Sequence, residues 1–313
     1  MVFRGYNVYY WSSDVFYIIG FASVVILSLK ALLFSLRFII KHFLSDIVGQ
    51  SVNLKKAGSW AVVTGSTDGI GKAYAEQLAE RGLNVVLVSR TQSKLDDVAA
   101  ALEARYNVKT RVIAADFCRE DIYDVIRVQL TGLDIAVLVN NVGMAYDFPE
   151  FFADVQEKYP DFSKDMIHMN CTSVAKMSEI VIPAMVEKKK GYVINIGSGC
   201  GSQPIPLMGL YSGTKAYVEM FTRSCQLEYA SEGVTFQYVK PFFVATKMSK
   251  LWTRKPSTFT PSPAMFVRNA LRLVGVEYST TGYWAHEIQE LLVSRFLPTR
   301  VLVPAMQWLG SRG

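Results

Sequence analysis

Residues 59–82 read SWAVVTGSTDGIGKAYAEQLAERG, and this stretch decides the fold. A short apolar run leads into a glycine-rich turn, and a helical pattern of apolar residues then continues to Gly82. Residues 84–90, NVVLVSR, form a second apolar run, and a polar stretch with helical character follows from Ser93 to about Arg105. The order strand, helix, strand is typical of a βαβ unit and predicts a parallel sheet.

Four further apolar runs predict four more strands of the same sheet. Each run ends in polar or turn residues, and the ligand crevice of an open α/β sheet lies at such carboxyl ends of strands. The runs are RVIAADF (111–117), IAVLVNNVG (135–143), YVINIGSG (192–199) and GVTFQYVKP (233–241). The sequence therefore predicts an α/β fold of the Rossmann type, a doubly wound parallel sheet with helices on both faces.

The glycine-rich turn predicts a nucleotide site. Backbone N–H groups and the positive end of a helix attract phosphate, and Gly65, Gly69 and Gly71 leave room for a pyrophosphate. Their spacing, G-x-x-x-G-x-G, differs from the G-x-G-x-x-G fingerprint, so the prediction depends on the βαβ context. An acid at the end of the second strand favours NAD, whereas an arginine favours NADP. Arg90 stands there, so we expect NADP(H); the alternative is a solvated loop arginine.

The stretch YSGTKAY (211–217) places a phenol and an ammonium on one helical face, because residues four apart share a face. We expect Lys215 to lower the pKa of Tyr211, so that the phenol exchanges a proton with a carbonyl or alcohol oxygen near neutral pH. Ser198, at the end of a predicted strand, can hydrogen-bond the same oxygen. A Tyr-x-x-x-Lys pair is informative only together with Ser198 and the glycine turn.

Taken together, these motifs resemble the short-chain dehydrogenase/reductase family over about residues 57–250. The resemblance implies Tyr211 as acid–base, Ser198 as donor to the substrate oxygen, Lys215 as ribose-binding residue and pKa modifier, and Asn170 in a water-linked proton relay. Without the motifs, Asn170 would be a helix-interior residue with local bonds. The motifs are TGSTDGIG (64–71), AADF (114–117), NNVG (140–143), MNCTS (169–173), NIGSG (195–199), YSGTK (211–215) and KPFFVATKM (240–248).

The resemblance also implies the cofactor site. Asp116 would contact the adenine, Asn140 would lie near the ribose, and Val244 and Thr246 would lie near the nicotinamide. The whole expected set is Thr64, Gly65, Ser66, Asp68, Gly69, Ile70, Gly71, Ser89, Arg90, Lys94, Asp116, Asn140, Tyr211, Lys215, Val244 and Thr246. Two positions depart from the family pattern: NNVG replaces the common NNAG, and Gly197 stands where a serine is frequent.

Residues 16–36, FYIIGFASVVILSLKALLFSL, are long and apolar enough to cross a bilayer as a helix, which needs about 20 residues. The next stretch, RFIIKHFL (37–44), suits an interfacial helix on the basic, cytosolic side. A helix buried in a core or dimer is one alternative. A cleaved signal peptide is another, although the run is too long and lacks a small-x-small cleavage site.

The expected organisation has three parts. Residues 1–50 form a membrane anchor and interfacial segment, residues 51–290 form the catalytic domain, and residues 291–313 form an apolar tail in contact with membrane or substrate. Pro298 and Pro304 argue against one straight spanning helix in the tail.

Composition excludes two kinds of site. The net charge is +6, from 33 basic and 27 acidic residues, but no basic run is interleaved with aromatics, so no nucleic-acid partner is expected. Three histidines and four scattered cysteines show no metal-ligand spacing, so no metal is expected. The cysteines suit reduced thiols of a domain that faces the cytosol.

A closer resemblance, carried by the apolar N-terminus, residues 64–82 and FVATKMSKLWTRKPSTFTPSPAMFV (243–267), is to membrane-bound very-long-chain 3-oxoacyl-CoA reductases and their hydroxysteroid dehydrogenase relatives. It implies NADPH-dependent reduction of a 3-oxoacyl-CoA in fatty acid elongation, at the endoplasmic reticulum membrane and facing the cytosol. The alternatives are a steroid ketone as substrate and a tethered NADP(H)-binding scaffold without turnover. Family members commonly form dimers or tetramers, which the residues alone do not decide.

A basic cluster follows the last motif. Its members could meet the phosphates of CoA, and the alternative is a solvated segment or contact with lipid headgroups. The cluster consists of Lys247, Lys250, Arg254 and Lys255.

Overall fold

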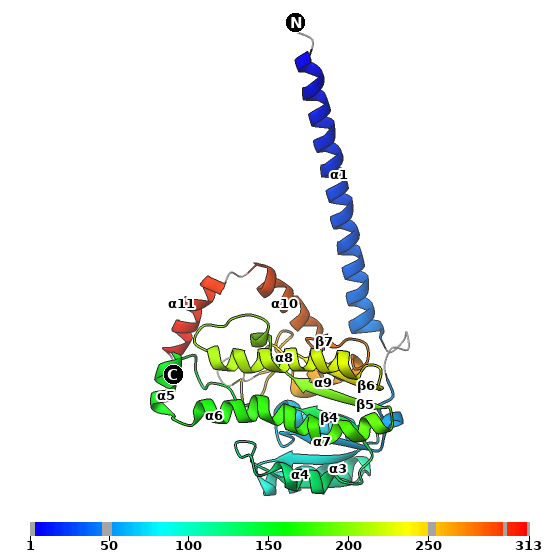
Figure 1. Ribbon diagram of the computed structural model, residues 1–313, viewed down its shortest axis with the longest axis vertical. Coiled ribbons are helices and arrows are strands. Elements are labelled where there is room, and N and C mark those ends of the chain that lie inside the picture. The colour runs from blue at the N-terminus through cyan, green and yellow to red at the C-terminus, as the bar shows by residue number, and fades with distance from the viewer. Residues whose placement is uncertain (1–3, 46–51, 250–254, 297–298, 312–313) are drawn as a thin grey trace. The chain divides into compact units, whose positions relative to one another are not determined.

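The structure is a computed structural model that describes residues 4–45, 52–249, 255–296 and 299–311. The chain divides into two units, Met1–Val48 and Gly49–Gly313, and each is described by itself (Figure 1).

The first unit is a long helix. Helix α1 spans Arg4–Ile39, 36 residues, and a π-helical turn follows at Ile40–Leu44. The segment Ser13–Leu44 contains an 18-residue stretch with a mean hydropathy of 2.2 and qualifies by length and composition as a membrane span. At 1.5 Å per residue, α1 is about 54 Å long, which exceeds the roughly 30 Å of a bilayer's hydrocarbon core.

The second unit is built on a sheet of seven parallel strands in the order β3-β2-β1-β4-β5-β6-β7. The chain reverses its direction of winding between β1 and β4, and such a switch point is where ligands bind in open α/β sheets. The predicted α/β fold is therefore confirmed. The strands are β1 Trp60–Thr64, β2 Asn84–Ser89, β3 Thr110–Ala114, β4 Ile135–Asn140, β5 Gly191–Ile196, β6 Val234–Val239 and β7 Ser279–Thr280.

Helices cover both faces of the sheet, because the central strands are apolar on both sides. Successive residues of β1 alternate: Ala61 and Val63 join one buried cluster, and Val62 joins the other. The first cluster packs against α2 (Gly69–Glu80), α3 (Gln92–Tyr106) and α9 (Pro263–Arg272). The second packs against α4 (Tyr123–Leu130), α7 (Ser173–Glu187) and α8 (Gly209–Tyr229).

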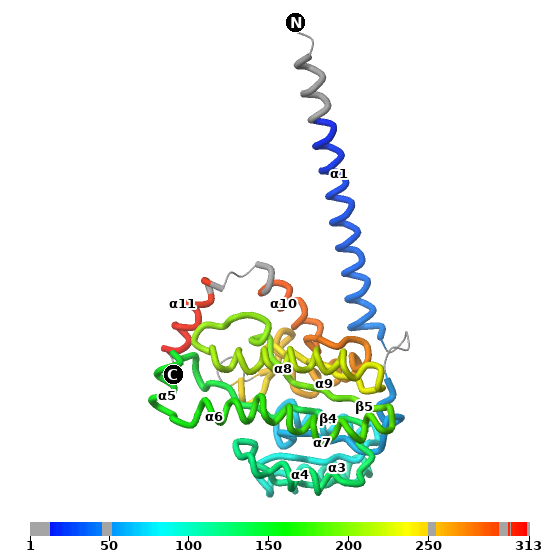
Figure 2. The backbone as a smooth tube through the Cα atoms, in the orientation of Figure 1, coloured from blue at the N-terminus to red at the C-terminus, as the bar shows by residue number. Residues whose placement is uncertain are grey.

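The C-terminal segment belongs to the second unit and forms two helices, α10 (Trp284–Phe296) and α11 (Thr299–Gly310), with Pro304 inside α11. Pro298 lies outside the described residues. Gly310 packs so closely that an added Cβ would overlap the Pro149 carbonyl oxygen. Helix α11 therefore ends against the chain that leads into α5 (Phe152–Lys158), which Figure 2 also shows. Helix α6 (Phe162–Ile167) follows α5.

Candidate active site

The glycine turn connects β1 to α2 and is fixed on several sides. Gly65 has a φ of 64°, a conformation that favours glycine, and its N–H donates to the Val88 carbonyl of β2 at 2.8 Å. Asp68 caps α2, since its carboxylate accepts a hydrogen bond from the Gly69 N–H at 2.8 Å. The turn therefore presents the N-terminus of a 12-residue helix, an arrangement that binds phosphate.

Gly71 packs closely against the glycine turn. A Cβ at Gly71 would overlap the Gly65 carbonyl oxygen and the Asn141 amide nitrogen. Its lack of a side chain therefore allows the first turn of α2 to pack on the glycine turn itself. That Gly71 also leaves room for a pyrophosphate stays a prediction.

Asn140 is held inside the protein by hydrogen bonds, and its place near the ribose stays a prediction. It is buried, and its amide nitrogen donates to Asn195 Oδ1 at 2.9 Å and to Ser178 Oγ at 3.3 Å, inside the second core cluster. Its neighbour Asn141 reaches the glycine turn, with Nδ2 donating to the Thr64 carbonyl at 3.0 Å and the Gly65 carbonyl at 3.2 Å. The alternation of side chains along β4 thus gives the contact with the turn to Asn141, which the sequence analysis did not select.

The end of β2 suits a 2′-phosphate. Arg90 and Lys94 are exposed and form no ion pair with any residue that the structure describes. The guanidinium of Arg90 and the ammonium of Lys94 can therefore meet an anion. The Ser89 hydroxyl lies 3.1 Å from the Thr67 hydroxyl, which joins this strand end to the glycine turn. Asp116 lies two residues after the end of β3, the strand next to β2. Its carboxylate accepts a hydrogen bond from the Cys118 N–H at 3.1 Å.

The loop after β6 folds onto the glycine turn. Val244 is buried, and Ser249 Oγ donates to its carbonyl at 2.6 Å. A Cβ at Gly69 would lie 3.2 Å from the Thr246 methyl carbon, so Thr246 lies directly over the start of α2.

Lys247 in this loop is engaged with the turn. Its ammonium lies 2.6 Å from the Asp68 carboxylate, and this contact holds the pKa of Asp68 below its usual value. Lys250 and Arg254 of the basic cluster lie outside the described residues.

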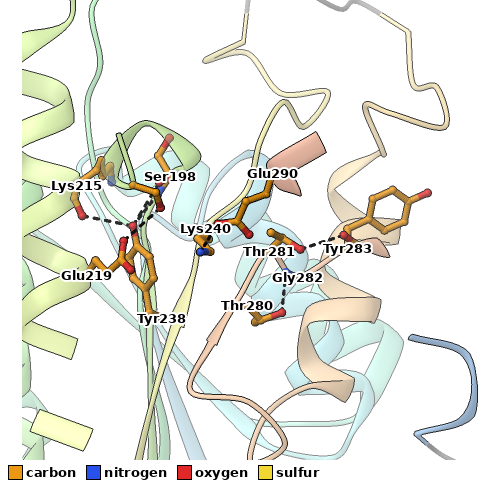
Figure 3. A network of polar contacts seen from close by, with 11 residues as sticks. Ser198, Lys215, Glu219, Tyr238, Lys240, Thr280, Thr281, Gly282, Tyr283 and Glu290 are labelled. Carbon is orange, nitrogen blue, oxygen red and sulfur yellow. Dashed lines mark hydrogen bonds and ion pairs between the residues drawn. The ribbon is translucent and has the colours of Figure 1, made fainter. Parts of the chain in front are cut away.

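His286 on α10 anchors the same loop and was missed by the sequence analysis. Its Nδ1 accepts from the Phe242 N–H at 3.4 Å and its Nε2 donates to the Phe243 carbonyl at 3.2 Å, so the ring is neutral. Burial lowers its pKa to about 4. An ion pair between Lys240 and Glu290 holds α10 to the end of β6 (Figure 3). No local pattern links residues 44 positions apart, so only the fold reveals this anchor.

Ser198, Tyr211 and Lys215 come together at the junction of β5 and α8. The Ser198 hydroxyl accepts from the Cys200 N–H at 3.2 Å and contacts the Tyr211 phenol. Lys215 Nζ donates to the Ile196 carbonyl at 3.3 Å and lies 5.7 Å from the Tyr211 ring centre. All three side chains are buried.

The pKa values of this group differ from the sequence-based expectation. Burial raises the pKa of Tyr211 well above its ordinary value of 10.0, because a phenolate loses hydration there. Burial also lowers the pKa of Lys215 to about 8. The expected lowering of the Tyr211 pKa by Lys215 is therefore wrong for this structure, in which burial dominates and only the hydrogen bond with Ser198 acts to lower the pKa. At neutral pH the phenol keeps its proton, which is the state a proton donor needs.

Asn170 lies in a π-helical turn, His168–Thr172, just before α7. Its Oδ1 accepts from the Met144 N–H at 2.8 Å, and its Nδ2 donates to the Met144 carbonyl and to Thr214 Oγ, each at 3.0 Å. The side chain therefore joins the loop after β4 to α8. A widened turn of this kind is frequent at functional sites, but the side-chain amide is used for positioning here.

The two halves of the site are contiguous. A Cβ at Gly143 would lie 2.9 Å from Asn170 Oδ1 and 3.4 Å from Lys215 Nζ. Two residues earlier, Asn141 hydrogen-bonds the glycine turn. The segment 141–143 thus connects the phosphate-binding turn to the Tyr211–Lys215 face, at the switch point between β1 and β4. The arrangement can hold a dinucleotide and present a proton donor beside its reactive end.

Comparison with known proteins identifies the family. Residues 59–257 match the family model of the short chain dehydrogenases. A very-long-chain 3-oxoacyl-CoA reductase of Homo sapiens is 50% identical over 237 residues, 76% of this chain and 75% of that protein. Very-long-chain 3-oxoacyl-CoA reductase-B of Danio rerio is 42% identical over 298 residues, 95% of this chain and 94% of that protein.

A solved structure agrees with the sequence relatives. A short-chain dehydrogenase from Sphingobium yanoikuyae in complex with NADPH is 28% identical and superposes with a TM-score of 0.64, over 71% of this chain and 86% of that chain. Residues 59–257, which match the family model, contain the glycine turn, Ser198, Tyr211 and Lys215. The chain is therefore an oxidoreductase of the short-chain dehydrogenase family.

Proposed function

We propose that this chain reduces the 3-keto group of a long-chain 3-oxoacyl-CoA to a 3-hydroxyacyl-CoA with NADPH, as in fatty acid elongation. The names of the two relatives support the substrate class. The observation that carries the proposal is the buried group of Ser198, Tyr211 and Lys215, which segment 141–143 connects to the glycine turn.

The cofactor assignment rests on charge and shape. The N-terminus of α2 suits a pyrophosphate, and the exposed Arg90 and Lys94 suit a 2′-phosphate, with no acid at the end of β2 to repel it. The related dehydrogenase that was solved with NADPH supports the same choice. NADPH supplies the hydride when bound.

The protein's own residues handle the proton and the orientation. Ser198 Oγ uses its acceptor side for the Cys200 N–H, so its O–H remains to donate to the ketone oxygen. Tyr211 gives its proton to that oxygen as negative charge develops, because an alkoxide is a stronger base than a phenolate. Lys215 would hold the ribose side of the cofactor, and its ammonium lies beside the phenol ring, where it would supply positive charge. Asn170 fixes the loop at Met144 that lines this space.

The surroundings of Tyr211 suit an aliphatic substrate. Its ring packs in an apolar cluster with Tyr146, Val155 and Met166. Helices α10 and α11 carry exposed apolar side chains, among them Leu292 and Trp308. We infer that the tail 291–313 contacts the acyl chain or the membrane surface. Replacing Leu292 and Trp308 with Glu should lower kcat/KM more for long acyl chains than for short ones if the tail contacts substrate.

We also infer that α1 anchors the enzyme in the endoplasmic reticulum membrane with the catalytic unit in the cytosol. The apolar span Ser13–Leu44 supports the anchor, and Arg37 and Lys41 at its end support a cytosolic location of that end. Protease added outside sealed microsomes should remove the catalytic unit, and full protection would contradict this orientation. Homo-oligomerisation stays an expectation from the family.

The deciding experiment compares substrates side by side. Full-length protein in detergent is given NADPH with 3-oxoacyl-CoAs of increasing chain length and, separately, with steroid ketones. We expect NADPH oxidation with the long-chain 3-oxoacyl-CoAs. Faster turnover of the steroid ketones would assign the site to hydroxysteroid chemistry, and no turnover of either class would refute the proposal.

A further inference from the structure

Tyr238 on β6 lies beneath the proposed catalytic residues, and no motif of the sequence marks it. Its side chain is fully buried. Its phenol accepts a hydrogen bond from the Ser198 N–H at 3.4 Å and can donate to the Ser198 carbonyl at 3.3 Å or the Lys215 carbonyl at 3.4 Å (Figure 3). One hydroxyl therefore joins the backbone of two proposed catalytic residues, Ser198 just after β5 and Lys215 on α8.

The ring of Tyr238 also explains Gly197. A Cβ at Gly197 would overlap the edge and the hydroxyl of this ring, so a side chain at 197 and tyrosine at 238 exclude each other. Gly197 is unusual for the family, because a serine is frequent at this position of the motif NIGSG. The Tyr238 phenol therefore occupies the space that a side chain at 197 would need.

A third contact places the same backbone under constraint. Gly201, in the turn after Ser198, lies so close to α8 that a Cβ would be 2.7 Å from the Lys215 carbonyl carbon. The turn thus packs on α8 at Lys215, whose carbonyl is also within hydrogen-bond distance of the Tyr238 phenol. Among the described residues, this phenol is the only acceptor for the Ser198 N–H.

We propose that Tyr238 is a positioning residue that holds Ser198 and Lys215 in register across the β5–α8 junction, and that Gly197 is the residue that makes room for it. This inference rests on the proposed function for its catalytic part. The ring fills the space, and the hydroxyl fixes the Ser198 peptide. The hydroxyl does not touch substrate or cofactor; it acts through the backbone of Ser198.

The catalytic part is tested with Tyr238→Phe, which keeps the ring and removes the hydroxyl. We expect kcat to fall about tenfold, because a displaced donor group costs rate in the chemical step. KM and the NADPH dissociation constant should stay within about twofold of wild type. The kinetic isotope effect on kcat, measured with NADPH deuterated at the transferred position, should rise, since hydride transfer becomes slower. A fold defect alone would reduce active protein and leave the isotope effect unchanged.

Tyr74→Phe is the matched control. Tyr74 is also fully buried, on α2, but its hydroxyl forms no hydrogen bond with any residue in the described part of the chain. Its replacement should leave kcat and the isotope effect unchanged. A Tyr238→Phe enzyme with kcat within about twofold of wild type and an unchanged isotope effect would overturn the positioning role.

The packing part is tested without turnover, by thermal unfolding of Gly197→Ser, Tyr238→Ala and the double variant. Gly197→Ser should lower the unfolding temperature in the wild-type background and lower it much less, or raise it, in the Tyr238→Ala background. Gly213→Ser is the control, because a Cβ at Gly213 meets nothing within 4 Å. Equal losses in both backgrounds would overturn the coupling. If the wild type reduces no ketone, the proposed function fails while these temperatures still decide the packing.

Discussion

The Lys215 ammonium nitrogen lies 5.7 Å from the centre of the Tyr211 ring, in a site where both side chains are buried. Burial acts on the two groups in opposite directions: it raises the pKa of the phenol and lowers that of the amine. Both shifts favour the neutral forms. A bound dinucleotide and ketone would therefore meet a protonated phenol, which is suited to reduction.

Replacement of Tyr211 with Phe removes the proposed proton donor and keeps the ring. We expect kcat to fall by about 10²–10⁴, the usual contribution of a positioned acid, while NADPH binds nearly as before. Turnover and NADPH fluorescence titration measure the two effects. Tyr217→Phe on the same helix is the control, because Tyr217 is partly exposed and stacks on Phe221. An undiminished rate in Tyr211→Phe would assign the acid to another group.

The contribution of Lys215 to stability should rise with pH above about 8. Its pKa is about 8 in the folded protein and 10.5 ordinarily, so between these values the unfolded chain binds more protons. The full difference is on the order of 3 kcal/mol. Chemical denaturation of the cofactor-free protein from pH 8 to about 9.5 should show the unfolding free energy of wild type rising relative to that of Lys215→Met. The cysteine thiols, whose pKa values burial raises, lower the stability of both proteins over this window, so the difference between the two proteins is what is measured. Higher pH is avoided because the buried tyrosines, with raised pKa values, act in the opposite direction.

The side chain of Arg90 should set the cofactor preference. Arg90→Ala combined with Ser89→Asp is expected to weaken NADPH binding and strengthen NADH binding, since the carboxylate repels a 2′-phosphate and accepts from a 2′-hydroxyl. The ratio of kcat/KM for the two cofactors measures the change. Arg268→Ala removes one exposed arginine from α9 and should leave that ratio alone. An unchanged ratio in the double variant would refute the phosphate role of Arg90.

Replacement of Gly71 and of Gly213 with alanine should change the unfolding free energy in opposite directions. Gly71→Ala drives a methyl group into the Gly65 carbonyl, so we expect a loss of about 1–3 kcal/mol in unfolding free energy and weaker cofactor binding. Gly213→Ala meets no atom within 4 Å and lies inside α8, so a gain of about 0.5–1 kcal/mol is expected. Denaturant titration compares the two. Similar effects at both positions would contradict the close packing of α2 on the glycine turn.

His286 should make the protein sensitive to mild acid. Its folded pKa of about 4 lies below the ordinary 6.5, so the unfolded chain binds more protons between these values and stability falls as pH drops from 6.5 to 4. The loss approaches roughly 3 kcal/mol. His286→Gln keeps one acceptor and one donor for Phe242 and Phe243 without titrating. Its stability should vary less with pH over this window, and an identical pH profile would exclude His286 as the cause.

The strands were predictable because parallel strands between two helix layers are apolar on both faces and appear as short continuous runs. The two-residue strand β7 carries no such run and was missed. The grouping of Ser198, Tyr211 and Lys215 was predictable from the resemblance, since strand ends and helix starts meet at the switch point.

Orientation and burial were less predictable. Asn140 and Asn141 are chemically identical, and only the pleat of β4 decides which one enters the core. The raised pKa of Tyr211 comes from burial, which a sequence does not show. His286 and Tyr238 act through contacts about 40 residues distant along the chain, where no periodic pattern applies.

The shared space of Gly197 and Tyr238 also constrains how the sequence can change over time. A side chain gained at 197 before Tyr238 shrinks would collide with an aromatic ring, whereas the reverse order leaves only a void. Substitution history at these two sites should therefore run in one direction, with 238 changing first. Lineages that descend from a glycine–tyrosine ancestor would carry the small residue at 238 as the older of the two replacements.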